Sequence, residues 1–243
     1  MSPAGDDKTL EVAVARKTLR IAAGESRVVL RDIAFSLKAG EVCAVLGPSG
    51  SGKTTLLRII AGLDHDFEGQ VSLPSPHKIG MVFQEPRLLP WRTVAQNLLL
   101  AGASSATGLD EIVAALGLAE HLNHFPGELS LGLARRAAIA RAFAIRPDLL
   151  LLDEPFVSLD AALALRLRAE LVALVDSRKA TTLLVTHDVE EAIALADRII
   201  ILSRPPGRMV ADKSIETPRL ALTPAAAAKA KTEVEALISV ASA

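Results

Sequence analysis

The chain has 243 residues, of which 50% are hydrophobic and 23% are charged, which suffices for one large domain with a sizeable core. The formal net charge of −1, with lysine and arginine scattered along the chain, excludes the basic footprint of a nucleic-acid binder. The apolar runs are too short for a membrane span of about 20 residues. The single cysteine, Cys43, excludes an internal disulfide.

Short β-rich runs open the chain, at residues 11–14, 18–22, 28–30 and 33–37. Glycine-containing breaks separate them, as is typical of strands joined by turns. We expect an antiparallel β-region at the N-terminus.

A glycine-rich loop between a strand and a helix is the most informative segment. Residues 42–46 predict a buried strand, residues 55–61 predict a helix, and the pattern G-x-x-x-x-G-K-[ST] lies between them. Its glycines let backbone N–H groups converge on a phosphate, aided by the start of the helix. We expect Lys53 to reach the β- and γ-phosphates and the Thr54 hydroxyl to hold Mg²⁺. The residues expected to bind the nucleotide are Gly47, Pro48, Ser49, Gly50, Ser51, Gly52, Lys53, Thr54 and Thr55.

The middle of the chain predicts two strands and then a helical lobe. Strands are expected at residues 70–73 and 79–83, and Gln84 follows the second of them. An amide at the end of a strand can contact both Mg²⁺ and an attacking water. Residues 94 to 146 have helical character without an evident strand, which predicts an inserted helical lobe.

Two carboxylates follow four leucines in the next predicted strand. Residues 149–152 predict a central buried strand, and Asp153 and Glu154 emerge at its carboxyl end, where open α/β sheets bind ligands. Phosphoryl transfer needs a metal ligand and a group that positions the attacking water. We expect Asp153 to orient Mg²⁺ and Glu154 to accept a proton from that water.

The rest of the chain alternates helix and strand, with helices at 161–175 and 189–196 and strands at 181–185 and 199–202. This alternation predicts an α/β fold with a mostly parallel sheet covered on both faces. His187 follows a strand and can donate a hydrogen bond to a γ-phosphate oxygen. The Ala-rich residues 224–240 predict a peripheral helix.

Together, and in this order, the motifs resemble those of the ATP-binding subunit of an ABC transporter, over about residues 10–207. The matching motifs are Walker A (47–54), the Q-loop glutamine (Gln84), Walker B (149–153), the catalytic glutamate (Glu154), the D-loop (158–160) and the switch histidine (His187). The resemblance implies the ABC ATPase fold, a P-loop NTPase core with the lobe at 94–146 inserted. We expect one domain over residues 1–217 and a helix or tail over 218–243.

The signature motif of this family is altered here. Where the family has Leu-Ser-Gly-Gly-Gln, residues 129–133 read Leu-Ser-Leu-Gly-Leu. By resemblance, Ser130 and Gly132 contact the γ-phosphate held by a second cassette, and Asp160 lies at the same interface. The leucines at 131 and 133 replace small and polar residues. We therefore expect weaker closure of the dimer on ATP, or closure that depends more on the membrane partner.

The resemblance also implies the ligands and partners. The cofactors are ATP and Mg²⁺, with catalysis by Glu154, His187 and Gln84 and metal binding by Thr54, Gln84 and Asp153. The implied partners are permease subunits, a second ATP-binding subunit in a homodimer, and a solute-binding protein, without nucleic acid. The implied location is peripheral, on the cytoplasmic face of the inner membrane.

Two stretches, around Trp91 and at residues 203–208, resemble importers of the nitrate, sulfonate and taurine group. Two alternatives remain open: a catalytically weak or regulatory cassette paired with a more active one, and a non-transport ABC ATPase that acts on nucleic acid. Residues 10–30 contain no aromatic residue on which adenine could stack. Because stacking contributes about 1–3 kcal/mol per base in other settings, we expect poor discrimination between ATP and GTP.

Overall fold

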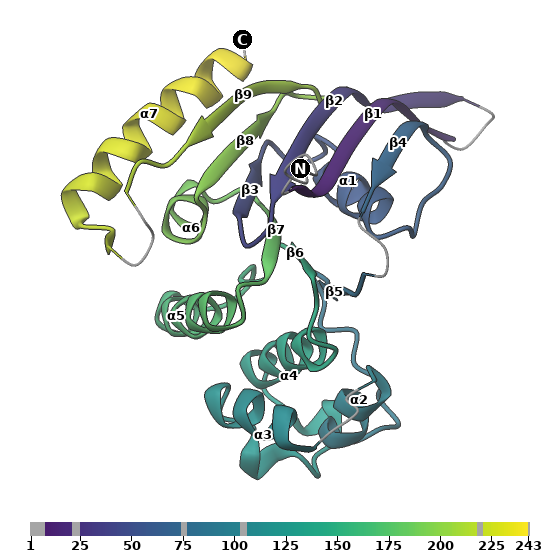
Figure 1. The fold of residues 1–243 in the computed structure, drawn as a ribbon, viewed down its shortest axis with the longest axis vertical. Helices are drawn as coiled ribbons and strands as arrows, with labels where there is room; N and C mark the ends of the chain where they lie inside the picture. The colour runs from purple at the N-terminus through teal and green to yellow at the C-terminus, as the bar shows by residue number, and fades with distance from the viewer. Residues whose placement is uncertain (1–7, 21–24, 74–76, 103–105, 218–220, 243) are drawn as a thin grey trace, which may run out of the picture. The chain divides into compact units, whose positions relative to one another are not determined.

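The computed structural model describes residues 8–20, 25–73, 77–102, 106–217 and 221–242 (Figure 1). The chain divides into two compact units. The first unit combines Met1–Pro76 with Thr181–Ala243, and the second is His77–Ala180. Among the helices of the described ranges, all are too short or too polar to cross a bilayer.

An antiparallel three-stranded sheet forms one part of the first unit. Its strands are β1 (Lys8–Arg20), β2 (Ser26–Lys38) and β4 (Glu68–Ser72), in the order β2-β1-β4. Alternate residues of β1 from Leu10 to Val14 are buried, opposite residues 33–37 of β2. This alternation is that of a sheet with one face on the core.

Strands β1 and β2 are longer than the sequence predicted. Each was expected as two short runs, but each is one continuous strand. The irregularities near the expected breaks are a register shift between Lys17 and Thr18 in β1 and a positive φ of 54° at Asp32 in β2, and neither interrupts its strand. Pairing across the hairpin carries both strands through polar residues that apolar patterning alone would exclude. Residues 21 and 22, which were expected in a strand, lie outside the described residues.

A second sheet of the first unit is mostly parallel. Strands β7 (Thr181–Thr186), β3 (Val42–Leu46) and β8 (Arg198–Leu202) are parallel neighbours in that order, and β9 (Met209–Ser214) joins β8 antiparallel. All residues of β3 and β7 are buried, which explains their unbroken apolar runs. Strand β9 was not predicted, because its sequence carries little apolar patterning and its pairing with β8 defines it.

Three helices complete the first unit. Helix α1 (Lys53–Ile60) packs against β7, and α6 (Val189–Leu195) packs against β3. Helix α7 (Pro224–Ser242), predicted over residues 224–240, contacts α6 and β8 (Figure 1). Val234 of α7 is fully buried and anchors this helix.

The second unit holds two strands and four α-helices among its described residues. Strands β5 (Ile79–Val82) and β6 (Leu149–Asp153) are parallel neighbours. The helices are α2 (Val94–Leu100), α3 (Ala106–Ala115), α4 (Leu131–Ala144) and α5 (Ala161–Arg178).

Helix α4 is the centre of the second unit and packs against α2, α3 and β5 (Figure 1). It begins at Leu131, where the side chain of Ser130 caps it. The described residues from 94 to 146 contain helices and 3₁₀ turns but no strand, as the sequence predicted for the lobe. A domain boundary at residue 217 stays a prediction.

Candidate functional site

The glycine-rich loop connects β3 to α1 in the first unit. Gly50 and Gly52 have φ angles of 79° and 93°, in the left-handed region that side chains disfavour. The N–H of Ser51 donates to the carbonyl oxygen of Pro48 at 3.1 Å, which tightens the turn. Gly52 is the N-cap of α1 and brings no side chain that would cover the helix start. The loop thus presents backbone N–H groups at a helix N-terminus, where anions bind.

Two polar side chains are buried in this loop. The Nζ of Lys53, a residue only 6% exposed, donates to the carbonyl oxygens of Gly47 at 2.8 Å and Pro48 at 3.2 Å. The hydroxyl of Ser51 is buried without a hydrogen-bond partner among the described residues. Because buried polar atoms are normally paired, this hydroxyl fits a loop whose remaining partner is a phosphate oxygen.

His187 lies at the same edge of the sheet as the loop. Leu46 at the end of β3 pairs in parallel register with Thr186 at the end of β7. Gly47 and His187 therefore leave neighbouring strands at the same edge. The side chain of Asp188 then accepts the N–H groups of Glu190 and Glu191 in the first turn of α6, which fixes the chain direction immediately after His187.

In the second unit, three expected site residues share one sheet edge. Val82 of β5 pairs with Leu152 of β6, so Gln84 and the pair Asp153 and Glu154 follow neighbouring strand ends. Asp153 is 3% exposed, whereas Gln84 lies on the surface. Glu154 has a φ of 45°, which is uncommon for a residue with a side chain. Such strained positions concentrate at functional sites.

The signature segment lies at the start of α4. The Ser130 hydroxyl accepts the N–H of Leu133 at 3.3 Å and caps the helix. Gly132 is buried, and a Cβ at this position would lie 2.5 Å from Cδ2 of Leu163 in α5. Leu131 is 45% exposed. Asp160 caps α5 in the same way, accepting the N–H of Leu163 at 3.0 Å.

Sequence reasoning missed two arginines of α4 that hold the loops of the second unit. The guanidinium of Arg135 donates to the carbonyl oxygens of Pro155 at 3.0 Å and Val157 at 2.6 Å. Arg141 donates to the carbonyl oxygens of Arg87 at 2.6 Å and Pro86 at 3.0 Å. Burial lowers the pKa of both guanidinium groups. Three arginines (Arg135, Arg136 and Arg141) in an alanine-rich helix were the available signal.

A profile of the ABC transporter family matches residues 30–157, slightly more than half of the chain. The chain is 48% identical over 194 residues to the aliphatic sulfonates import ATP-binding protein SsuB 2 of Streptomyces avermitilis, covering 79% of this chain and 77% of the relative. It is 43% identical over 217 residues to the protein of the same name from Pseudomonas syringae pv. tomato, covering 86% of this chain and 90% of the relative. The chain belongs to the ATP-binding subunits of ABC transporters.

A solved ABC cassette agrees with this membership. The dimeric ATP-binding cassette MJ0796, in a post-hydrolysis state bound to ADP and Pi, matches with a TM-score of 0.75 at 30% identity. The match covers 86% of this chain and 100% of that chain. The predicted family, ABC ATPase fold, ATP binding and ATPase activity are confirmed, as is the main functional prediction of an ATP-binding subunit of an ABC transporter. The regulatory and nucleic-acid alternatives gain no support.

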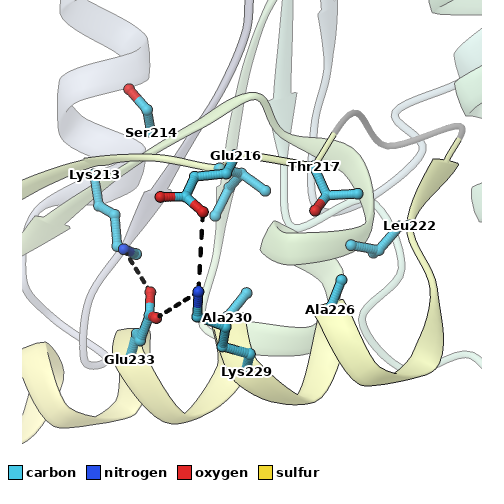
Figure 2. A pocket seen from close by; sticks show the side chains of 10 residues that line it. Lys213, Ser214, Glu216, Thr217, Leu222, Ala226, Lys229, Ala230 and Glu233 are labelled. Atoms are coloured by element: carbon cyan, nitrogen blue, oxygen red, sulfur yellow. Dashed lines mark ion pairs between the residues drawn. The ribbon is translucent and has the colours of Figure 1, made fainter.

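A separate pocket of this ABC cassette lies between β9 and α7 (Figure 2). The side chain of Lys213 pairs with Glu233 at 2.6 Å. Lys229 lies 3.9 Å from Glu233 and 4.0 Å from Glu216. The charges that line the pocket thus compensate one another, and none of the predicted site residues lies there.

Proposed function

We propose that this chain hydrolyses ATP at the residues predicted above, and that this hydrolysis powers the import of small sulfonates. The observation that carries the site is the glycine loop, in which Lys53 and the Ser51 hydroxyl are buried at the N-terminus of α1. The sulfonate class is supported by relatives whose names specify aliphatic sulfonates import, at 42–48% identity over most of the chain.

On the first unit, the loop from Gly47 to Thr55 would hold the phosphates by its backbone N–H groups. Lys53 would exchange its present carbonyl partners for β- and γ-phosphate oxygens. The hydroxyl of Thr54 would be one ligand of Mg²⁺, which neutralises charge on the β- and γ-phosphates. His187 would donate a hydrogen bond to a γ-phosphate oxygen.

On the second unit, Asp153 would orient Mg²⁺ and Gln84 would contact both the ion and the attacking water. Glu154 would accept a proton from that water. Ser130 and Gly132, with Asp160 of the D-loop, would face the nucleotide of a second copy of this chain. Opening of the Ser130 cap would release its hydroxyl for a phosphate oxygen.

We also propose a further partner and a location for the cassette. A solute-binding protein would deliver the sulfonate, and the cassette would sit peripherally on the cytoplasmic face of the inner membrane. The second unit exposes large apolar side chains, among them Trp91, Leu99, Leu100 and Phe125. Exposed apolar residues of this size are typical of interfaces, and we assign Trp91 to the contact with a permease.

The proposed chemistry is tested by Glu154→Gln in the cassette assembled with its permease. Because general-base catalysis contributes typically 10²–10⁴-fold, phosphate release should fall by at least about a hundredfold. ATP binding should persist, and the variant should accumulate as a closed dimer. Glu120→Gln, at an exposed position outside the site, is the control. Unchanged phosphate release in Glu154→Gln would overturn the assignment of the base.

The proposed solute is tested separately with the complex reconstituted in liposomes together with its binding protein. Alkanesulfonates should stimulate ATP hydrolysis, and nitrate at the same concentration should not. Stimulation by nitrate alone would refute the sulfonate proposal and leave the ATPase assignment intact.

A further inference from the structure

We infer that the turn between β8 and β9, residues 203–208, is a positioning element for the phosphate loop, and that Gly207 is its critical residue. This inference rests on the proposed function, because it takes residues 47–54 as the phosphate site. All of the contacts that support it lie within the first unit.

Three glycines allow the phosphate loop to pack closely against its neighbours: Gly47 and Gly52 of the loop itself, and Gly207 of the turn. A Cβ at Gly47 would lie 2.8 Å from Oγ of Ser51 and 3.2 Å from the carbonyl oxygen of Leu202. A Cβ at Gly52 would lie 2.6 Å from Cδ2 of Leu30 in β2. The loop is therefore wedged between the end of β8 and β2.

Gly207 makes the third contact. A Cβ at this position would overlap the backbone carbonyl oxygen of Ser51. Backbone atoms cannot rotate away as a side-chain tip can, so a larger residue at 207 must displace either the turn or the phosphate loop.

The turn is itself fixed, so the phosphate loop is the part expected to move. The N–H of Gly207 donates to the carbonyl oxygen of Val29 at 2.8 Å, and its carbonyl oxygen accepts the N–H of Arg31 at 2.9 Å. These bonds join the turn to β2, which also contacts β9 (Figure 1). The Ser203 hydroxyl closes the turn from within, accepting the N–H of Arg208 at 3.1 Å and lying 3.0 Å from the carbonyl oxygen of Pro206.

A displaced Ser51 would misalign the N–H groups that receive the phosphates. The consequence is weaker binding of every nucleotide that places a β-phosphate there. Gly207 is thus a positioning residue that acts through Ser51 and does not touch the nucleotide.

The test is isothermal titration calorimetry of the full-length chain with ADP and with ATP, each with Mg²⁺. Hydrogen bonds to charged groups are among the stronger ones in proteins, so Gly207→Ala should raise both Kd values by about tenfold or more. The control is Gly127→Ala, where a Cβ would meet no atom of the described residues within 4 Å. Circular dichroism establishes that each variant is folded at the temperature of the titration.

A folded Gly207→Ala protein with wild-type Kd values would overturn the inference. If that variant does not fold, Ser203→Ala decides, because it loosens the turn without adding bulk. It should raise both Kd values by about threefold. Ser203→Thr, which keeps the hydroxyl, should bind both nucleotides with wild-type Kd values. Wild-type affinity in Ser203→Ala would then refute the inference. A wild-type chain that binds neither nucleotide would instead overturn the proposed phosphate site, and this inference with it.

Discussion

The helix starts of α1 and α4 are both predicted to face phosphate, yet they are built differently. At α1 the N-cap is Gly52, and the preceding loop is wedged against β2 and the end of β8. At α4 the N-cap is Ser130, whose hydroxyl already accepts an N–H of its own helix. The first start carries no side-chain cap and is held by the surrounding fold, whereas the second is capped by Ser130 and would have to change partners to bind an anion.

The glycines at the two helix starts also serve different purposes. Gly50 and Gly52 adopt left-handed backbone conformations. Gly132 does not, and it is required by the close approach of Leu163. Glycine is thus required for its backbone conformation at the start of α1, and for close helix packing at the start of α4. The following substitutions test this contrast.

The largest effect is expected from Lys53→Met at the α1 start. The substitution keeps the length of the side chain but removes the charge and the donors predicted to reach the phosphates. Affinity for ATP should fall on the order of a hundredfold, measured by calorimetry. Lys38→Met, at an exposed position in β2, is the control. An affinity within twofold of wild type would mean that the phosphate loop binds ATP without Lys53.

The next effect is expected from Arg135→Ala in α4. It leaves the carbonyl groups of Pro155 and Val157 without their guanidinium donor. Of the two bonds only the one to Pro155 is fully buried, and an unpaired buried group costs about 1–3 kcal/mol, so the free energy of unfolding should fall by about 1–3 kcal/mol in urea titrations. Arg166→Ala, on the exposed side of α5, should leave it unchanged. Equal stability of the two variants would contradict the assigned role.

A smaller loss is expected from Gly132→Ala. The new methyl group meets the tip of the Leu163 side chain, which can turn aside, so the free energy of unfolding should fall by about 1 kcal/mol. Adding Leu163→Ala should make the two changes less than additive, which a double-mutant cycle measures. If the cycle shows no coupling, Gly132 is not retained for packing against α5.

The smallest effect concerns the two leucines of the signature segment. Leu131→Gly combined with Leu133→Gln restores the small and polar character of the family pattern and should favour closure. ATPase activity of the assembled complex should rise by about threefold, a difference of less than 1 kcal/mol. Unchanged or lower activity would show that the leucines do not weaken closure.

The sequence was most informative about short motifs at the ends of strands. The glycine-rich loop after β3, the carboxylates at the end of β6 and the histidine after β7 follow from local patterns there. The parallel pairings of β3 with β7 and of β5 with β6 bring them to common edges within each unit. The apolar runs that mark the strands and the alignment of the strand ends are both consequences of a buried parallel sheet, so the sequence pattern predicts which residues lie at a common edge.

The sequence was least informative where contacts join distant segments. Strand β9 is defined by its pairing with β8, and the bonds of Arg135 and Arg141 reach carbonyl groups 20 to 55 residues away. Every residue has a backbone carbonyl group, so the amino-acid sequence cannot show which carbonyl groups an arginine binds. The role of Gly207 beside Ser51 is hidden for the same reason.

The bonds of Arg135 and Arg141 in α4 have a mechanical consequence. One ties the helix to the segment after β6, and the other ties it to the segment after β5. A tilt of α4 would therefore displace both segments together. A displacement that a permease imposes on either segment would be transmitted to the other through this one helix.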